Sequence, residues 1–280
     1  MADTAFQKQY RQEYIAGFES GESPLRMSVT TEFVRKGNTA EFLVADSGGA
    51  EASTRGVNGL IPARADNLSQ KTATLVEWHD LVRKTSFNVF ASQGDQKRIM
   101  QDTTLKVMNR KIDADIITEL ATGTNDTGAA ATGSLTLVTK AIGILGLAKV
   151  PVQEIDNMWG LISPAMYTYF MRDTTFTSRD YVDMAPLAGG PLKRVLRWAG
   201  VNWLVHPDVP GVGTNAEKCF VYHRSAIGHA CDKDTLASVV GYDEEQDYSY
   251  ARTTCFMGSE LLQNGGVCVI NHDGSAIVAS

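Results

Sequence analysis

The sequence lacks the features of several common protein classes. No stretch reaches the roughly 18 apolar residues that a membrane-spanning helix needs. The longest weakly polar run, 135–152, is interrupted by Thr139, Lys140 and Lys149. The first 14 residues are polar and charged and contain no apolar leader core. We therefore expect no membrane partner and no secretion leader, and a protein that is made and kept in the cytoplasm.

Excess basic charge is also missing. The chain has 26 lysines and arginines against 32 aspartates and glutamates, which gives a net charge of -6. A protein that reads DNA sequence usually presents a basic surface, so the composition argues against that class. It is compatible with a protein that merely encloses nucleic acid. With 43% hydrophobic residues, the 280-residue chain can bury one large core or two modest ones.

Catalytic motifs are weak or absent. There is no G-x-x-x-x-G-K-[ST] phosphate loop, which weighs against a nucleotide hydrolase. Ala45-x-Ser47-x-Gly49 approximates a nucleophile elbow but lacks its first glycine, and no helix is expected after it. Asp113 and Asp115 would point about 200° apart on a helix, so they cannot form a paired-carboxylate site. We predict no catalytic residue and no cofactor.

The four cysteines, Cys219, Cys231, Cys255 and Cys268, contain no C-x-x-C pair. With His223 and His229, two of them give spacings of C-x-x-x-H and H-x-C, whereas structural zinc sites usually use closer pairs on tight turns. We therefore interpret the cysteines as reduced, buried thiols and predict no metal site.

The most regular pattern predicts a long helix over Asp95–Thr122. Asp95 is a suitable N-cap, and Gly123 is a suitable terminator. Leu105, Met108, Ile112, Ile116 and Leu120 recur at helical spacing on one face. A helix of this length spans roughly 40 Å at 1.5 Å per residue, well above the average of about 11–12 residues.

The N-terminal third differs from the rest. Ala5–Glu19 is predicted to form a helix with an aromatic stripe at Phe6, Tyr10, Tyr14 and Phe18. Strands are expected within Met27–Ala45 and over Thr72–Leu81. Between them, Ser47–Asn67 is rich in glycine and poor in large apolar residues. It is either a disordered linker or a long arm of a protruding hairpin that another subunit orders.

The remainder predicts an α+β body. A helix is expected from a Ser134 cap to Ala148, a buried strand over Met158–Ile162, and a helix that starts at Pro164. Gly189-Gly190-Pro191 predicts a turn. Short strands are then expected over Trp203–His206, Cys219–His223, Leu236–Val240, Tyr248–Thr254 and Val267–Asn271.

This order of parts resembles the major capsid proteins of tailed bacteriophages and the related encapsulins, which share the Hong Kong 97-like fold. In that family an N-terminal arm leads into an extended β-hairpin loop, a long spine helix, and peripheral and axial domains. The residues that carry the resemblance are Ala2–Ser23, Gly37–Asp80 with Thr54-Arg55-Gly56 and Leu60-Ile61-Pro62, Asp95–Thr122, the Pro164 helix, Arg194–Val205, Met257-Gly258 and Gly265–Ile270.

The resemblance implies four interleaving parts. These are an arm over 1–36, the extended loop and return strand over 37–93, the spine helix and peripheral domain over 94–190, and the axial domain with closing strands over 191–280. It implies a non-enzymatic coat protein whose pentamers and hexamers build an icosahedral shell around double-stranded DNA. The virion would be assembled in the host cytoplasm. Expected partners are other copies of the chain, a separate scaffolding protein, a portal, and DNA bound without sequence specificity.

Contacts between subunits are expected at Phe6, Tyr10 and Tyr14 of the arm and at Arg55 and Arg64 near the loop tip. Two alternatives stay open at this point. One is an α+β hydrolase that uses Ser47, His79 or His206, and the other is a monomeric binding module.

Overall fold

A computed structural model describes residues 22–47, 50–64, 67–92, 95–177, 195–233 and 235–278. The chain divides into two compact units that interleave along the sequence. The first contains Glu77–Ile112 and Lys233–Phe256, and the second contains Pro24–Val76, Asp113–Asp232 and Met257–Ser280. The division at residues 36, 93 and 190 that the resemblance implies stays a prediction. The helix expected over Ala5–Glu19 and the turn at 189–191 lie outside the described residues.

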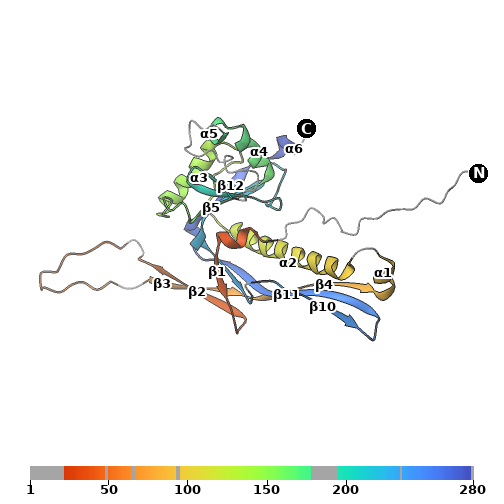
Figure 1. The fold of residues 1–280 in the computed structure, drawn as a ribbon. Helices are drawn as coiled ribbons and strands as arrows, with labels where there is room; N and C mark the ends of the chain where they lie inside the picture. Colours follow the sequence, from red (N-terminus) through yellow and green to blue (C-terminus); the bar gives the residue numbers. More distant parts are fainter. Residues whose placement is uncertain are drawn as a thin grey trace, which may run out of the picture. The chain divides into compact units, whose positions relative to one another are not determined.

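The described residues form the following elements in chain order (Figure 1). They are η1 (Leu25–Ser28), β1 (Thr30–Phe33), β2 (Thr39–Asp46), β3 (Asn67–Thr74), β4 (Val76–Thr85), α1 (Ser86–Ala91), α2 (Gln96–Leu120), α3 (Leu135–Leu147), β5 (Met158–Ile162), α4 (Pro164–Arg172), α5 (Thr174–Thr177), β6 (Leu196–Trp198), β7 (Val201–Val205), β8 (Glu217–His223), η2 (Arg224–Ala226), β9 (Ile227–Cys231), β10 (Ser238–Asp243), β11 (Tyr248–Leu261), η3 (Asn264–Gly266), β12 (Val267–His272) and α6 (Ser275–Val278). No helix among them is both long and apolar enough to cross a membrane.

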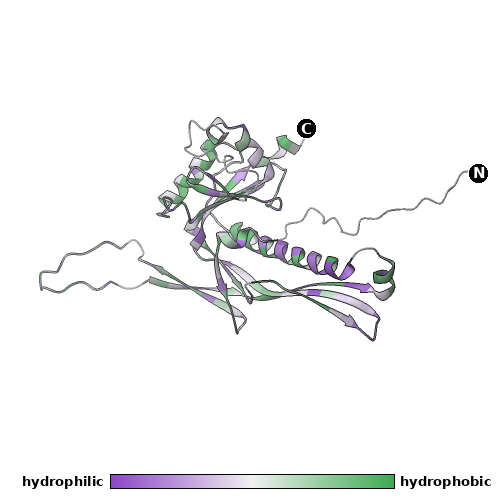
Figure 2. Ribbon diagram, in the orientation of Figure 1, coloured by the Kyte–Doolittle hydropathy of each residue, from purple (hydrophilic) through white to green (hydrophobic). Residues whose placement is uncertain are grey.

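Helix α2 confirms the long helix predicted from the sequence, and hydrophobic and hydrophilic residues alternate around it (Figure 2). The Asp95 carboxylate caps it, accepting hydrogen bonds from the backbone N–H groups of Lys97 and Arg98 at 3.1 and 3.2 Å. Its buried residues recur every four positions, and Thr104 rather than the predicted Leu105 continues the stripe. Burial of Thr104 is tolerated because its hydroxyl is hydrogen-bonded to Gln101, Ser238 and Thr253. The fully buried members of the stripe are Met100, Thr104, Met108, Ile112, Ile116 and Leu120.

In the first unit, residues of α2 pack against strands β4, β10 and β11, which belong to a five-stranded sheet of order β1-β9-β11-β10 with β4 also on β11. β10 pairs with β11 from Ser238↔Thr253 to Asp243↔Tyr248, and β4 also pairs with β11. The Lys111 ammonium lies 3.9 Å from the ring centroid of Trp78, which ties α2 to β4. Buried apolar side chains in the same unit, among them Met100, Met108 and Cys255, add to this contact.

The second unit contains a five-stranded sheet in the order β12-β8-β5-β7-β6. β5 pairs in parallel with β7, and the other pairs are antiparallel. All five residues of β5 are buried, as the apolar run Met158–Ile162 predicted. Gly160 is required in this strand because a Cβ there would lie 2.3 Å from the Trp203 ring.

Helices α3 and α4 cover an apolar core on this sheet. α3 begins at the predicted Ser134 cap, and α4 begins at Pro164 as predicted, with Ser163 as its cap. The two serine hydroxyls accept hydrogen bonds from the backbone N–H groups of Leu137 and Met166. Phe170 packs its ring 4.9 Å from Trp198 and 5.3 Å from Trp203, measured between ring centroids. The four cysteines are buried and unbridged, which confirms their interpretation as free thiols.

We predict that Ile112→Pro abolishes soluble protein. Proline inside a helix costs about 3 kcal/mol or more, and Ile112 is 1% exposed, so its packing is lost as well. Ile112→Val is the matched control, with an expected cost of about 0.5–1.5 kcal/mol and a normal yield. Soluble yield and thermal melting report the outcome. A proline variant that melts like the valine variant would show that α2 is not continuous through this position.

Candidate contact hairpin and a buried carboxylate centre

Strands β2 and β3 form the protruding hairpin that the sequence predicted. They pair antiparallel along their whole length, from Thr39↔Thr74 to Asp46↔Asn67. Only the base is buried, where Ala40, Phe42 and Ala73 pack with Ala230 and Leu262. Gly228 lies against the Phe42 ring so closely that a Cβ there would be 2.9 Å from it. The hairpin is therefore anchored at one end only (Figure 1).

The described residues between the two strands, 47 and 50–64, contain no helix or strand, and all of them are exposed. A tight turn closes the tip. The Gly56 N–H donates to the Leu60 carbonyl at 2.9 Å, and the Gly59 N–H donates to the Gly56 carbonyl at 2.8 Å. Gly59 has φ +72°, a conformation that favours glycine. This turn presents three large apolar side chains to solvent, with exposures of 107% for Val57, 73% for Leu60 and 70% for Ile61.

The five predicted contact residues have different outcomes. Phe6, Tyr10 and Tyr14 lie outside the described residues. Arg55 and Arg64 are both exposed on the loop. The Arg64 guanidinium donates to the Ser47 carbonyl at 3.2 Å, so it bridges the two arms of the loop. Their role between subunits stays a prediction. The sequence analysis named Leu60 and Ile61 only as part of the resemblance and did not predict a contact role for the apolar trio Val57, Leu60 and Ile61.

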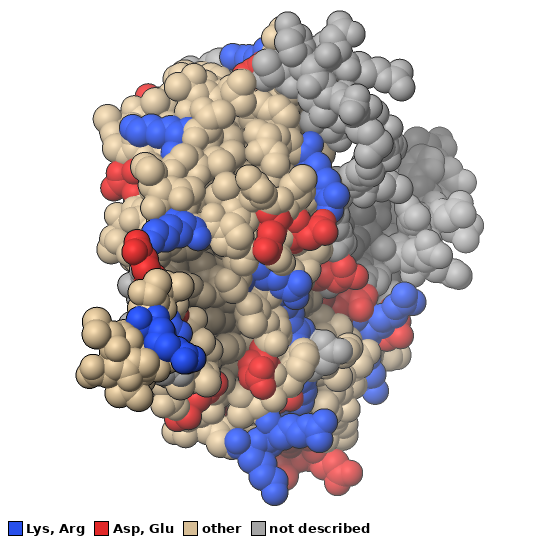
Figure 3. Space-filling model, turned by 90° about the vertical axis from the view of Figure 1, so that its left-hand side faces the viewer, with Lys and Arg blue, Asp and Glu red and all other residues tan. Residues whose placement is uncertain are grey.

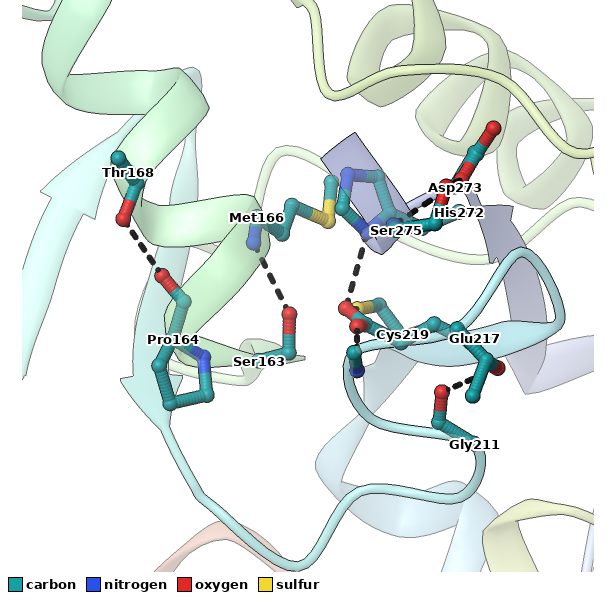
Figure 4. Close-up of polar contacts among 12 residues, drawn as sticks. Ser163, Pro164, Met166, Thr168, Gly211, Glu217, Cys219, His272, Asp273 and Ser275 are labelled. Atoms are coloured by element: carbon teal, nitrogen blue, oxygen red, sulfur yellow. Dashed lines mark hydrogen bonds and ion pairs between the residues drawn. The ribbon is translucent and has the colours of Figure 1, made fainter. Parts of the chain in front are cut away.

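A second notable site is the wholly buried Glu217 carboxylate (Figure 4). It accepts hydrogen bonds from His272 Nδ1 at 2.9 Å, from the Gly213 N–H at 2.9 Å, from the Cys219 thiol at 3.7 Å and from the Ser163 hydroxyl. Glu217 and Cys219 lie two residues apart on β8, and His272 faces Glu217 across the β12 pairing. The carboxylate thus joins β8, β12, the start of α4 and the loop before β8.

The electrostatics of this centre follow from its donors. Burial alone would raise the pKa of Glu217, but the hydrogen bonds from His272, Ser163 and Gly213 together lower it below its ordinary value. Burial strongly raises the pKa of the Cys219 thiol, which keeps it protonated. Glu217, Cys219 and His272 are also metal-ligand types close together. Four protein donors satisfy the carboxylate. Among the described residues, His272 Nε2 is buried without a hydrogen-bond partner.

The other candidate ligands do not join this centre in the described part of the chain. His229 Nδ1 lies 3.0 Å from the Ser259 hydroxyl, which donates to Asp115 at 2.7 Å. The serine thus gives its proton to the carboxylate and not to the imidazole, the reverse of a catalytic triad. Burial, aided by Arg26, lowers the pKa of His229 to about 4. Cys231 accepts a hydrogen bond from the same arginine at 3.1 Å.

The three residues considered for a hydrolase have separate partners. The Ser47 carbonyl binds Arg64, as described above. His206 is buried with Nε2 3.3 Å from Asp113, while its Nδ1 accepts from the Asp208 N–H at 3.1 Å. His79 lies 2.9 Å from both Glu77 and Thr254, but on an exposed strand surface rather than in a site that excludes water. The geometry therefore gives no support to the hydrolase alternative.

The comparisons with known proteins agree with the fold. A family model described as "Phage capsid protein" matches residues 2–274, which is nearly the whole chain. The chain belongs to this phage capsid protein family. The capsid protein is accordingly a structural coat protein and a virion component whose copies form an icosahedral shell. Its α+β fold is the one that the sequence analysis expected.

Solved capsid structures share the fold at low sequence identity. A chain of Mycobacterium phage Che8 is 16% identical with a TM-score of 0.74, and the alignment covers 96% of this chain and 98% of that one. The capsid of cyanophage P-SCSP1u gives 13% identity and a TM-score of 0.73 over 95% and 93% of the two chains. The capsid of the native GTA particle gives 13% identity and a TM-score of 0.69, and the alignment covers 96% of this chain and 95% of that one. No curated protein matches the chain.

We predict that Glu217→Gln destabilises the isolated subunit by about 1–3 kcal/mol near neutral pH, because an amide cannot accept all four hydrogen bonds. The lowered pKa also fixes the direction in which the stability contributed by Glu217 changes with pH. The stability that Glu217 contributes is present above its ordinary pKa of 4.5 and is lost as the pH falls through the lowered value. The difference between wild type and variant should therefore shrink on acidification.

Urea unfolding at several pH values measures this difference. Glu51→Gln, at an exposed loop position, is the matched control and should unfold like the wild type at every pH. A difference for Glu217→Gln that stays constant down to low pH would contradict an ionised, hydrogen-bonded carboxylate.

Proposed function

We propose that this capsid protein builds pentamers and hexamers in which the β2–β3 hairpin of each subunit docks on a neighbouring copy. The observation that carries the proposal is the apolar tip. Burial of a large apolar side chain stabilises by about 1.5–3 kcal/mol, whereas an exposed ion pair at Arg55 or Arg64 adds only about 0.2–1 kcal/mol. The tip trio is therefore the main attractive element, and the two arginines add orientation.

The hairpin suits assembly better than it suits a monomeric module. Its tip contributes nothing to the core of its own subunit, and monomeric proteins seldom expose such apolar groups together. Each contact is modest in free energy, but it repeats at every subunit and becomes effective by multivalency. The glycine turn at the tip allows the adjustment that pentameric and hexameric positions require.

We further infer that the shell encloses double-stranded DNA without reading its sequence, and that it assembles in the host cytoplasm with a separate scaffolding protein and a portal. The net charge of -6 suits an enclosing wall better than a DNA-reading surface. On the face drawn in Figure 3, basic and acidic side chains are interspersed and no large patch of one sign appears.

We predict that replacing Val57, Leu60 and Ile61 by serine leaves a folded subunit that stops at monomers or isolated capsomers. All three side chains are exposed in the subunit, so its melting temperature and circular dichroism should stay unchanged. Negative-stain microscopy and light scattering report the particle size. A triple variant that still closes into normal shells would contradict the proposal.

Two controls accompany this variant. Serine at Glu51, Thr54 and Asn58 changes the same number of exposed loop residues and should leave assembly intact. Alanine at Arg55 and Arg64 tests the arginines and should slow or weaken assembly less than the apolar triple. A monomeric wild type would favour the binding-module alternative instead.

A further inference from the structure

A second surface lies at one end of the first compact unit, where α1 follows β4. We propose that this surface, the α1 end, is a head-to-tail contact between copies of the chain, in which the acidic part of one copy faces the basic part of the next. It consists of the exposed Phe87 and Phe90 of α1, the acidic turn 243–247 between β10 and β11, and Lys97 and Arg98 in the first turn of α2. Figure 1 labels these elements. The proposal rests on self-assembly as proposed above but concerns a different surface from the hairpin.

Helix α1 has no role in the core of its own unit. None of its six residues is buried, and it exposes 74% of Phe87 and 88% of Phe90. These two side chains are three positions apart and so lie on one helix face. A helix this short gains little from its own hydrogen bonds. An element that costs ordering entropy and exposes two aromatic rings is typical of an interaction site.

The α1 end is nevertheless held in place. The Thr85 hydroxyl caps α1 by accepting from the Asn88 N–H at 3.3 Å. The Ser86 N–H donates to the backbone carbonyl of Asp247 at 3.3 Å. The Ser86 hydroxyl donates to the side-chain carboxylate of Asp247. The Lys84 ammonium donates to the Gln96 side chain at the start of α2. These contacts bring α1, the acidic turn and the first turn of α2 together before any partner binds.

The acidic turn supplies one sign of charge. A hydrogen bond from Tyr248 lowers the pKa of the Asp243 carboxyl. Hydrogen bonds from Ser86 and Tyr242 lower the pKa of the Asp247 carboxyl. Both carboxyls are therefore ionised at neutral pH. Glu244 and Glu245 between them are exposed, and their side chains form no ion pair within the described residues.

The basic turn supplies the opposite sign. Lys97 and Arg98 are exposed, and in the described part of the chain their side chains form no ion pair. Cations are unfavourable in the first turn of a helix because the macrodipole places positive charge there. These two positions therefore work against the stability of the subunit itself, which favours a role in association.

An apolar centre that is flanked by free groups of both signs fits a second copy of the same surface. The acidic turn of one subunit can face the basic turn of the next while the phenylalanines pack between them. Such a head-to-tail contact closes into a ring when the rotation allows it. Nucleic acid is a poor occupant, because the turn at 243–247 carries four carboxylates.

Charge reversal tests this pairing. Lys97→Glu with Arg98→Glu places acid against acid, and Glu244→Lys with Glu245→Lys places base against base. We expect each pair to lower the yield of closed particles at least about tenfold, because like charges across an interface cost several kcal/mol. The chain that carries all four substitutions should recover most of the yield. Phe87→Ser with Phe90→Ser should lower the yield without rescue by either charge pair.

Melting and circular dichroism check that each variant folds. We expect every variant to fold because all of the changed residues are exposed. Normal shells from both reversed pairs, or no recovery in the combined chain, would overturn the α1 end as a contact. The hairpin triple separates this outcome from failure of the proposed function. If that triple blocks assembly while both charge pairs assemble normally, the hairpin stands and the α1 end does not.

Discussion

A carboxylate without access to water has to find every donor within the protein, and Glu217 places this constraint on much of the second unit. Its four donors come from β8, β12, the residue before α4 and the loop before β8. Each of these segments must hold its position for the charge to be satisfied. Gly274 provides room, since a Cβ there would lie 2.5 Å from Glu217 Oε2. The packing of α4 on the sheet is thus coupled to one polar centre.

The protruding hairpin obeys a different constraint, because it must be fixed at its base and free at its tip. The fixed part is small and apolar, with Phe42 packed where Gly228 leaves space. Beyond Asp46 no described residue of the loop is buried. Folding of the subunit therefore does not depend on the tip. The apolar residues of the tip have no core contacts in their own subunit that docking on a neighbour would break.

Local signals explain which elements were predictable from the sequence. Asp95, Ser134 and Ser163 cap the helices that they precede, and the buried run Met158–Ile162 is a strand as expected. The single strand expected over Thr72–Leu81 is two strands, because the chain leaves the β3 pairing at Leu75, whose N–H donates to the Asn38 carbonyl. β9 escaped prediction because Ile227–Cys231 holds one β-branched residue beside a glycine, a histidine and an alanine, so neither an apolar run nor an alternation marks it as a strand.

The candidate sites were less predictable because they depend on distance along the chain. Glu217 and His272 are separated by 55 residues, and only the β8–β12 register brings them together. The cysteine and histidine spacings therefore pointed to residues that do not form one cluster. Arg55 and Arg64 were predicted as contact residues from their charge. The apolar trio beside them could be identified as a contact only once the structure showed that its side chains are exposed.

The two exposed surfaces suggest a division between the free energy of folding and that of assembly. Neither the hairpin tip nor helix α1 of the α1 end buries a residue in its own unit. Substitutions at these surfaces should then change association while leaving the subunit's free energy of unfolding almost unchanged. The converse holds for Glu217 and Ile112, which are buried in the subunit and present nothing to a neighbour. A subunit built in this way reaches its folded state before it meets another copy, and weak contacts that repeat across a shell are then sufficient to hold it.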